Sequence, residues 1–344
     1  MKEKTKKEKQ GHARLFELAG ARKNKLTLAC LLSVLSSAAR IVPFFTIYGV
    51  VVELLAHYTA PAEADQGKIL ALCAITFGAA LVYGVCAYAS SAISHTAAYE
   101  IIYELRLQLM EKLSRISSGY FTGTTQGAIK KIVSDDSDQI EAFLAHHLCE
   151  IAAAIATPVF TLLYLFFMDW RLALVTLLPI CISLWMLSSC LRQPDKAALQ
   201  AELHDAQERM QGTVVEYIHG MSVVKVFNRT LSAFRRYEGD LNHFTDVVER
   251  TARANARPMG AYYAFFGAQL LFLLPAALLL IPTADSYLDF LPVILLFFLV
   301  GGGLKEPLEN MMQMVILSSR ILEGVRRMDN ILRQPEPDQE GTGN

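Results

Sequence analysis

The stretch from Ile69 to Ile116 reads ILALCAITFGAALVYGVCAYASSAISHTAAYEIIYELRLQLMEKLSRI and contains no proline. Its first part is almost wholly apolar, and charged residues enter only towards its end. At 1.5 Å per residue, one continuous helix of this length would reach about 70 Å, more than twice the roughly 30 Å thickness of the membrane hydrocarbon core. We therefore predict a membrane-spanning helix whose C-terminal part projects well beyond the bilayer.

Five further apolar tracts accompany this one, each near the roughly 20 residues that a helix needs to cross the hydrocarbon core. The six tracts lie near Leu26–Leu55, Ile69–Ala98, Ile140–Met168, Leu172–Leu191, Met259–Ile281 and Tyr287–Leu304. An even number of crossings places both chain ends on one side of the membrane. The predicted fold class is thus an all-α, polytopic membrane protein with six long transmembrane helices.

Composition and charge support this interpretation and give it an orientation. The chain is 53% hydrophobic and only 19% charged, and the charges gather between the apolar tracts. The first 25 residues are rich in Lys and Arg, whereas the three short connecting loops hold Lys68 and Arg171 as their only clear cations. By the positive-inside rule, the long basic connections and both termini are cytoplasmic. The N-terminus does not resemble a cleaved secretory signal.

Three segments follow from this pattern. Residues 1–25 form a basic cytoplasmic segment, residues 26–333 a six-helix membrane domain, and residues 334–344 a linker or disordered end. Helix-forming residues continue outside the membrane from Leu199 to Tyr217 and from Thr230 to Ala256. We expect these stretches to be extensions of the membrane helices rather than separate domains.

The sequence lacks the motifs of the common catalytic classes. It contains neither a GxxxxGK[ST] phosphate loop nor a Walker-B-like or LSGGQ-like motif, so this chain alone is not expected to hydrolyse ATP. The six cysteines lie in or beside apolar tracts and are expected to be small buried hydrophobes. His146, His147 and Cys149 suggest a metal site, but adjacent histidines point to different helix faces, and we expect no metal there.

Two turns between long helices are more distinctive. In the first, a helix ends at Ser117–Gly119, the aromatic pair Tyr120 and Phe121 follows, and Gly127 precedes a new helix capped near Asp135. The second has the sequence EYIHGMSVVKVFNR, and its notable residues are Glu216, Gly220, Lys225 and Phe227. Ordinary helix hairpins would have the same shape, so that alternative stays open.

The order of these elements resembles the transmembrane domain of ABC transporters with the exporter (type IV) fold, from about Arg14 to Arg333. Besides the two turns, the likeness rests on Asp136, on the turn Asp169, Trp170, Arg171, Leu172, and on Pro307, Leu308, Ser319, Arg320 and Ile321. One departure is Ser117, where many members have proline.

The resemblance implies a mechanism. Ser117–Thr122 and Gly220–Val226 would be coupling helices that dock on nucleotide-binding domains, and two six-helix halves, identical or different, would enclose one pathway. ATP and Mg²⁺ would bind in the nucleotide-binding domain, which this chain lacks. The sequence leaves open whether that domain was truncated or is a separate subunit.

Polar residues within membrane spans are candidates for the substrate pathway because burying them in lipid is costly. The candidates are Arg40, His95, Tyr262, Tyr263, Gln269, Glu309 and Asn310. If Arg40 faces a cavity, it favours an anionic substrate; an ion pair within the bundle is the alternative. Lys305 and Glu309 are spaced for a salt bridge.

A candidate hinge lies in the sixth helix and consists of Gly301, Gly302, Gly303 and Pro307, with close helix packing as the rival explanation.

The predicted function is the membrane-spanning part of an ATP-driven transporter in a bacterial cytoplasmic membrane. Export of a hydrophobic or amphipathic compound is the family default. The first span, ARIVPFFTIYGVVVELL, also resembles a subgroup of exporter-fold proteins that import ferric siderophores. A membrane scaffold or sensor that does not transport is the alternative from another class.

Overall fold

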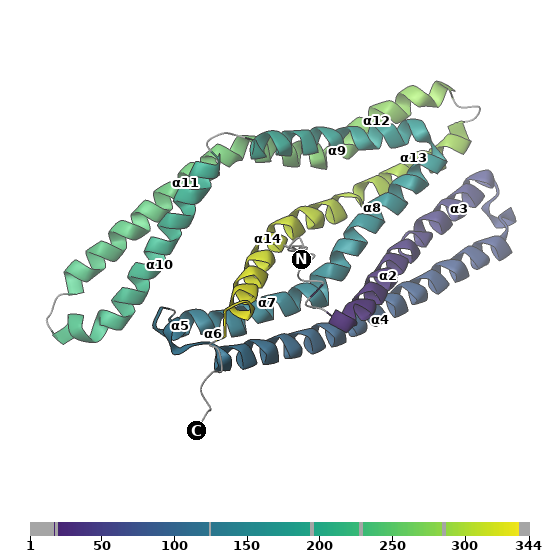
Figure 1. The fold of residues 1–344 in the computed structure, drawn as a ribbon. Coiled ribbons are helices and arrows are strands. Elements are labelled where there is room, and N and C mark those ends of the chain that lie inside the picture. Colours follow the sequence, from purple (N-terminus) through teal and green to yellow (C-terminus); the bar gives the residue numbers. More distant parts are fainter. Residues whose placement is uncertain are drawn as a thin grey trace, which may run out of the picture. The chain divides into compact units, whose positions relative to one another are not determined.

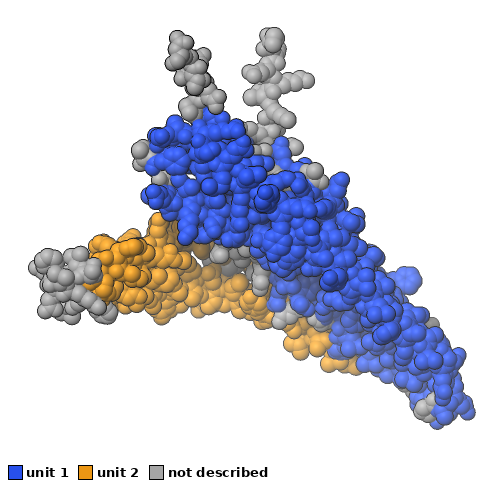
Figure 2. Space-filling model, turned by 90° about the horizontal axis from the view of Figure 1, so that it is seen from below, with its two compact units in different colours: residues 1–170, 281–344 blue, residues 171–280 orange. Residues whose placement is uncertain are grey.

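The computed structural model describes residues 17, 20–123, 125–192, 196–226, 230–283 and 287–336. The basic segment before Glu17, the end after Glu336 and Phe227 of the second turn therefore lie outside the described residues. The chain divides into two compact units, residues 1–170 with 281–344 and residues 171–280 (Figure 2). Every regular element in the described ranges is a helix.

The first unit contains both ends of the chain (Figure 1). Its helices are α2 (Lys23–Ala39), α3 (Val42–Ala56), α4 (Gln66–Arg115), α5 (Ser118–Gly123), α6 (Gln126–Lys131), α7 (Ser137–Ala142), α8 (Leu148–Met168), α13 (Tyr287–Gly302) and α14 (Lys305–Leu332). Two π-helical turns, η3 (Ile132–Asp136) and η4 (Phe143–His147), connect α6, α7 and α8. Short 3-10 turns occupy Gly20–Arg22, Pro61–Glu63 and Ile281–Thr283.

The second unit is made of long helices. They are α9 (Trp170–Leu191), α10 (Lys196–Val226), α11 (Thr230–Gly267) and α12 (Gln269–Leu280). Helices α10 and α11 pack against each other. The helical conformation predicted for Leu199–Tyr217 and Thr230–Ala256 is confirmed, since these stretches lie inside α10 and α11.

The predicted spans coincide with the long apolar helices. Within the described ranges, five helices are long and apolar enough to cross a membrane, and the pair α11 and α12, bent by 41°, brings the number to six when counted as one span. The continuous helix predicted from Ile69 to Ile116 is confirmed by α4, which runs for 50 residues. The all-α, polytopic membrane fold is therefore established.

Small polar side chains join α2 and α4 to each other and to the helical stretch formed by η4 and α8. The hydroxyl of Ser90 donates to the carbonyl of Ala29 at 2.7 Å, Ser94 to Ala145 at 2.6 Å, and Ser33 to Cys149 at 2.8 Å. Small residues allow membrane helices to approach closely, and their hydroxyl groups then reach backbone carbonyls of the neighbouring helix. These contacts fix the register of the three helices.

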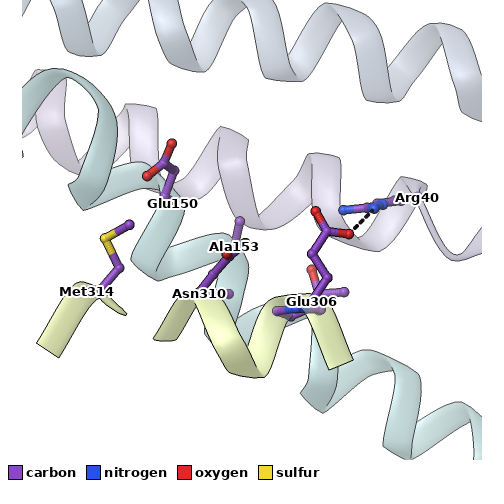
Figure 3. Close-up of a pocket in the computed structure, with 9 residues that line it drawn as sticks. Arg40, Glu150, Ala153, Glu306, Asn310 and Met314 are labelled. Carbon is purple, nitrogen blue, oxygen red and sulfur yellow. Dashed lines mark ion pairs between the residues drawn. The ribbon is translucent and has the colours of Figure 1, made fainter. Parts of the chain in front are cut away.

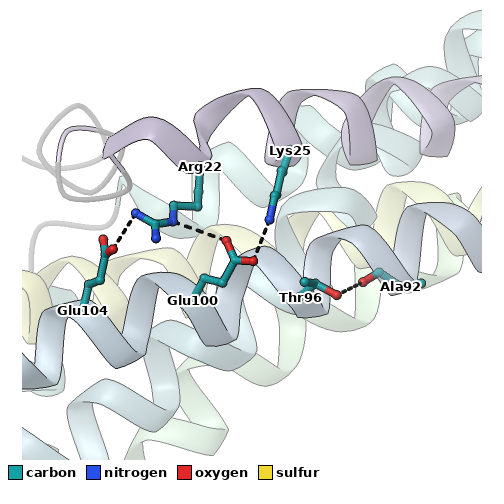
Figure 4. Close-up of polar contacts among 6 residues, drawn as sticks. All are labelled: Arg22, Lys25, Ala92, Thr96, Glu100 and Glu104. Atoms are coloured by element: carbon teal, nitrogen blue, oxygen red, sulfur yellow. Dashed lines mark hydrogen bonds and ion pairs between the residues drawn. The ribbon is translucent and has the colours of Figure 1, made fainter.

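Charged residues fix the start of α2 on α4 (Figure 4). Arg22 pairs with Glu100 at 3.3 Å and with Glu104 at 2.6 Å, and Lys25 pairs with Glu100 at 2.6 Å. Beyond this point one face of α4 is buried against other elements of the first unit. Its apolar residues at helical spacing, Ile101, Ile102, Leu105 and Leu109, join residues of α7, η4 and α14 in one buried cluster.

Local helix boundaries differ from the expectations at several places. The first span breaks at Arg40 and Ile41, because Pro43 has no backbone N–H to donate and is accommodated in the first turn of a new helix, α3. The predicted cap near Asp135 is wrong: the helix after the first turn begins at Gln126, and the Thr125 hydroxyl accepts from the Ala128 amide at 3.2 Å. Residues Gly220–Val226 are not a separate element but the last turns of α10.

Candidate functional site

A polar pocket of about 210 Å³ lies within the first unit (Figure 3). The break between α2 and α3, the helix α8 and the start of α14 supply its walls. The lining residues are Arg40, Glu150, Ala153, Ala154, Thr157, Glu306, Pro307, Asn310 and Met314. Two helix discontinuities thus meet at one pocket.

Arg40 is both ion-paired and accessible. Its guanidinium lies 3.7 Å from a carboxylate oxygen of Glu306, and the two side chains are 54% and 71% exposed. Exposed pairs of this kind contribute only about 0–1 kcal/mol. The two alternatives for Arg40, a cavity wall and an ion pair, therefore occur together, and the pair is weak enough to open.

The pocket also carries negative charge. Glu150 lines it along with Glu306, and a second interaction orients Glu150: its Oε2 lies 2.9 Å from Nδ1 of His147. The expected preference for an anionic substrate rested on Arg40 alone. With two carboxylates, one from α8 and one from α14, lining the pocket beside Arg40, the side chains suit a ligand that combines hydrogen-bond donors with acceptors.

Of the two substrate-pathway candidates on α14, one lines the pocket and the other does not. Asn310 lines it and is exposed, whereas Glu309 is half-buried and is not among the lining residues. The side chain of Lys305, its expected partner, lies outside the described part.

The proposed hinge coincides with a break in the helix. Helix α13 ends at Gly302, Gly303 and Leu304 form a turn, and α14 starts at Lys305. Pro307 lies in the first turn of α14, where proline is tolerated. Gly301 is buried in the last turn of α13. Whether the break bends during transport stays a prediction.

Three candidates lie in the second unit. Tyr262 is 2% exposed and stacks on Phe266 with ring centres 5.3 Å apart, while Tyr263 is 50% exposed. Gln269 follows the break at Ala268 between α11 and α12 and is 5% exposed. Its side-chain amide nitrogen finds no hydrogen-bond partner among the described residues, which is costly for a buried donor.

His95 contacts another histidine. It is half-buried on α4, and its ring centre lies 4.5 Å from that of His146 on η4. His95 is not among the residues that line the pocket.

The first predicted coupling turn is a short helix. Helix α5 covers Ser118–Gly123, close to the expected Ser117–Thr122, and Ser117 precedes it with its carbonyl accepting from the Tyr120 amide at 3.0 Å. Tyr120 packs against the buried cluster, whereas Phe121 is 45% exposed. Gly119 is exposed. The turn therefore has one aromatic residue anchored in the cluster, Tyr120, and one exposed aromatic residue, Phe121, whose ring contacts that of Tyr120 edge to face.

The second turn is described in part. Glu216 on α10 is exposed and pairs with Arg236 on α11 at 3.3 Å, and Gly220 is half-buried. The side chain of Lys225 lies outside the described residues, as does Phe227. Val215 and Ile218 are 54% and 65% exposed.

Several lining residues were missed by the sequence reasoning. Glu150 lies within the predicted span Ile140–Met168, so the rule that singled out Arg40 would also have found it. Glu306 lies in the first turn of α14, and its ion pair with Arg40 was not predicted. Their contact joins positions far apart in the chain, and local sequence patterns do not reveal such pairs.

The fold and this pocket define a class of membrane protein. The sequence matches the family described as the ABC transporter transmembrane region over residues 26–300, and the chain belongs to this family. This establishes the membrane-spanning, multi-pass part of a transporter that works with an ATP-binding partner domain.

Individual relatives are similar over part of the chain. The mycobactin import ATP-binding/permease protein IrtA of Mycobacterium tuberculosis is 33% identical over 61% of this chain and 24% of its own length. IrtA of Mycolicibacterium smegmatis is 30% identical over 62% of this chain and 24% of its own length. The ATP-dependent lipid A-core flippase of Burkholderia orbicola is 26% identical over 51% of this chain and 29% of its own length. The chain thus matches about a quarter of the length of these relatives, from 24% to 29%.

Proposed function

We propose that this chain forms half of the translocation pathway of an ATP-driven transporter. The observation that carries the proposal is the polar pocket at Arg40 and Glu306, which lies where two membrane helices are interrupted. Interrupted helices in membrane transporters free backbone groups and bring polar side chains to the substrate path. A second six-helix half, identical or different, completes the pathway.

The energy for transport comes from nucleotide-binding domains, which bind ATP and Mg²⁺. The chain itself is not an ATPase; α5 and the end of α10 contact those domains. Support comes from the exposed Phe121 on α5 and the exposed Val215 and Ile218 on α10, which offer apolar surface for docking. The continuous α4 connects α5 to the membrane as one rigid element.

The location we propose is the cytoplasmic membrane, with both termini in the cytoplasm. Support comes from the basic N-terminal segment and from the scarcity of cations in the three short loops.

The substrate we favour is a ferric siderophore, taken up by import. Support comes from the 33% identity with a relative that is named a mycobactin importer. A pocket with both charges and an amide, Asn310, is suited to a chelate rich in carbonyl and hydroxyl groups. Export of a lipid-like compound is the second candidate because of the similarity to lipid A-core flippases at 26–28% identity.

Uptake of radioactive iron tests the proposal. The chain is reconstituted with its nucleotide-binding domain and partner half, and uptake of ferric siderophore is compared with outward movement of a labelled lipid. Arg40→Ala should reduce iron uptake at least fivefold. Arg253→Ala, which removes an exposed arginine paired with Glu249, serves as the matched control and should leave uptake unchanged.

The outcomes separate the alternatives. Movement of lipid without iron uptake would favour the exporter. If neither compound moves and ATP hydrolysis is independent of both, the non-transporting scaffold becomes the better explanation.

A further inference from the structure

Two histidines from different elements meet outside the pocket. His95 lies on α4 and His146 on the π-helical turn η4, with ring centres 4.5 Å apart and ring planes at 84°. His95 is half-buried and His146 is exposed. The pair therefore combines two imidazoles from distant positions with access from outside.

The backbone holds this pair in place. The residues directly before each histidine are hydrogen-bonded to each other, since the Ser94 hydroxyl donates to the Ala145 carbonyl at 2.6 Å. Ser94 is fully buried and Ala145 is 2% exposed. The relative position of the two histidines is thus fixed by a buried contact one residue away.

The π-helical turn directs the neighbouring histidines to different partners. The ring of His146 contacts that of His95, whereas Nδ1 of His147 lies 2.9 Å from Oε2 of Glu150. Turns of this kind insert an extra residue into an α-helix and are frequent at functional sites. His147 is therefore engaged elsewhere, and His95 and His146 form the pair.

The separation of the rings suits a shared metal ion. With metal–nitrogen distances of about 2.0–2.1 Å and tetrahedral geometry, two coordinated imidazole rings have centres roughly 5 Å apart. The observed separation is 4.5 Å with the ring planes at 84°, so the two rings are near enough to share an ion once their side chains turn one nitrogen of each towards it. Imidazole is a preferred ligand of Zn²⁺, Cu²⁺ and Ni²⁺, whereas Mg²⁺ and Ca²⁺ prefer oxygen.

We propose that His95 and His146 bind a divalent transition-metal ion of the zinc class. Within the described residues no cluster of three or more His, Cys, Asp or Glu side chains is arranged for a metal, so the protein supplies two ligands. Water or an exogenous ligand fills the other positions. A metal held here would link α4 to η4 and oppose their separation.

Binding of Zn²⁺ to the purified full chain in lipid nanodiscs tests the proposal, with competition against a chromophoric chelator as readout. We expect one Zn²⁺ per chain, and at least tenfold weaker binding in both His95→Gln and His146→Gln. The matched controls are His147→Gln, beside the site, and His204→Gln, on an exposed position of α10. Both controls should bind as the unchanged chain does, and Mg²⁺ should not compete.

A second measurement keeps the test independent of folding defects. In the unchanged chain, Zn²⁺ should protect His146 from modification by diethyl pyrocarbonate while His204 continues to react. The absence of stoichiometric Zn²⁺ binding would overturn the proposal. So would binding that survives in His95→Gln and His146→Gln, or equal modification of His146 with and without Zn²⁺.

Discussion

Arg327 on α14 holds the carboxylate of Asp136 at the end of η3 with two parallel hydrogen bonds. Its Nε donates to Oδ2 at 2.8 Å and its Nη2 to Oδ1 at 2.9 Å. Asp136 is 1% exposed, whereas the Arg327 side chain is 33% exposed. Bidentate pairs of this type are among the strong hydrogen bonds of proteins. The contact fixes α14 to the segment that leads from α5 into α8.

Removing the arginine should be costly because it leaves a buried carboxylate without its partner. For Arg327→Ala we expect a loss of about 3 kcal/mol in unfolding free energy, the lower end of the range for broken buried pairs, since Arg327 is partly solvated. The hydrogen bonds that Arg327 donates to the Asp136 carboxylate raise the pKa of its guanidinium, so the arginine stays charged at every pH at which the protein is stable. Unfolding in a denaturing detergent series, followed by circular dichroism, measures the change.

The neighbouring Arg326 provides the control for this prediction. It is 72% exposed and pairs with Glu323 at 3.1 Å, so Arg326→Ala should change stability by less than about 1 kcal/mol. Equal losses in the two variants would show that the bond to Asp136 is not what stabilises α14.

The sequence predicts the features that depend on local periodicity. The six apolar tracts correspond to the candidate membrane spans of the structure. The proline-free stretch from Ile69 to Ile116 corresponds to the continuous helix α4. Breaks were harder to place. Pro43 indicates the interruption at Arg40, whereas nothing in the composition of Gly220–Val226 distinguishes the end of a long helix from a turn.

Contacts between distant residues were beyond local patterns. The pair Arg40 and Glu306, and the contact of His95 with His146, depend on how helices pack. The position of His146 also depends on η4, because an inserted residue in a helix changes the direction of the side chains that follow.

Substitutions of the two aromatic residues of α5 should have different effects, one on the stability of the protein and the other on its coupling to ATP hydrolysis. Tyr120 packs against the buried cluster, so Tyr120→Ala should destabilise the protein by about 1–3 kcal/mol. Phe121 is 45% exposed, so Phe121→Ala should leave stability within about 0.5 kcal/mol while reducing substrate-stimulated ATPase activity of the assembled transporter. Melting curves and ATPase assays on the same preparations measure both. Unchanged stimulation in Phe121→Ala would remove α5 from the docking surface.

The ion pair between Glu202 and Arg250 should make the stability of the second unit depend on pH. Arg250 on α11 lies within 2.5 Å of Glu202 on α10, and its hydrogen bond lowers the pKa of that carboxyl. Because the pKa of Glu202 is lower in the folded state than in the unfolded chain, the ionised carboxylate stabilises the folded state. This stabilisation is fully present above the ordinary glutamate pKa of about 4.3, and it is lost as the pH falls through the lowered pKa of the folded state. Amide hydrogen exchange in α10 and α11 should therefore be the same at pH 7 and 5, after correction for intrinsic rates, and faster at pH 3.

Glu202→Gln is the matched control for this dependence. It removes the titrating carboxyl at an exposed position, so the increase in exchange between pH 5 and pH 3 should become smaller. An identical increase in the variant would assign the effect to other carboxylates.

A charge exchange tests whether Arg40 and Glu306 act as a pair in transport. Arg40→Glu alone places three carboxylates around the pocket, those of the new glutamate, Glu150 and Glu306. Their repulsion should push the α2/α3 break and α14 apart. We expect at least tenfold slower transport in this variant. Adding Glu306→Arg restores one cation to the pocket and opposite charges at the contact of 3.7 Å, so the double variant should recover to within about threefold of the original rate. If the double variant transports no faster than Arg40→Glu, then Arg40 contacts the substrate directly and its ion pair with Glu306 is incidental.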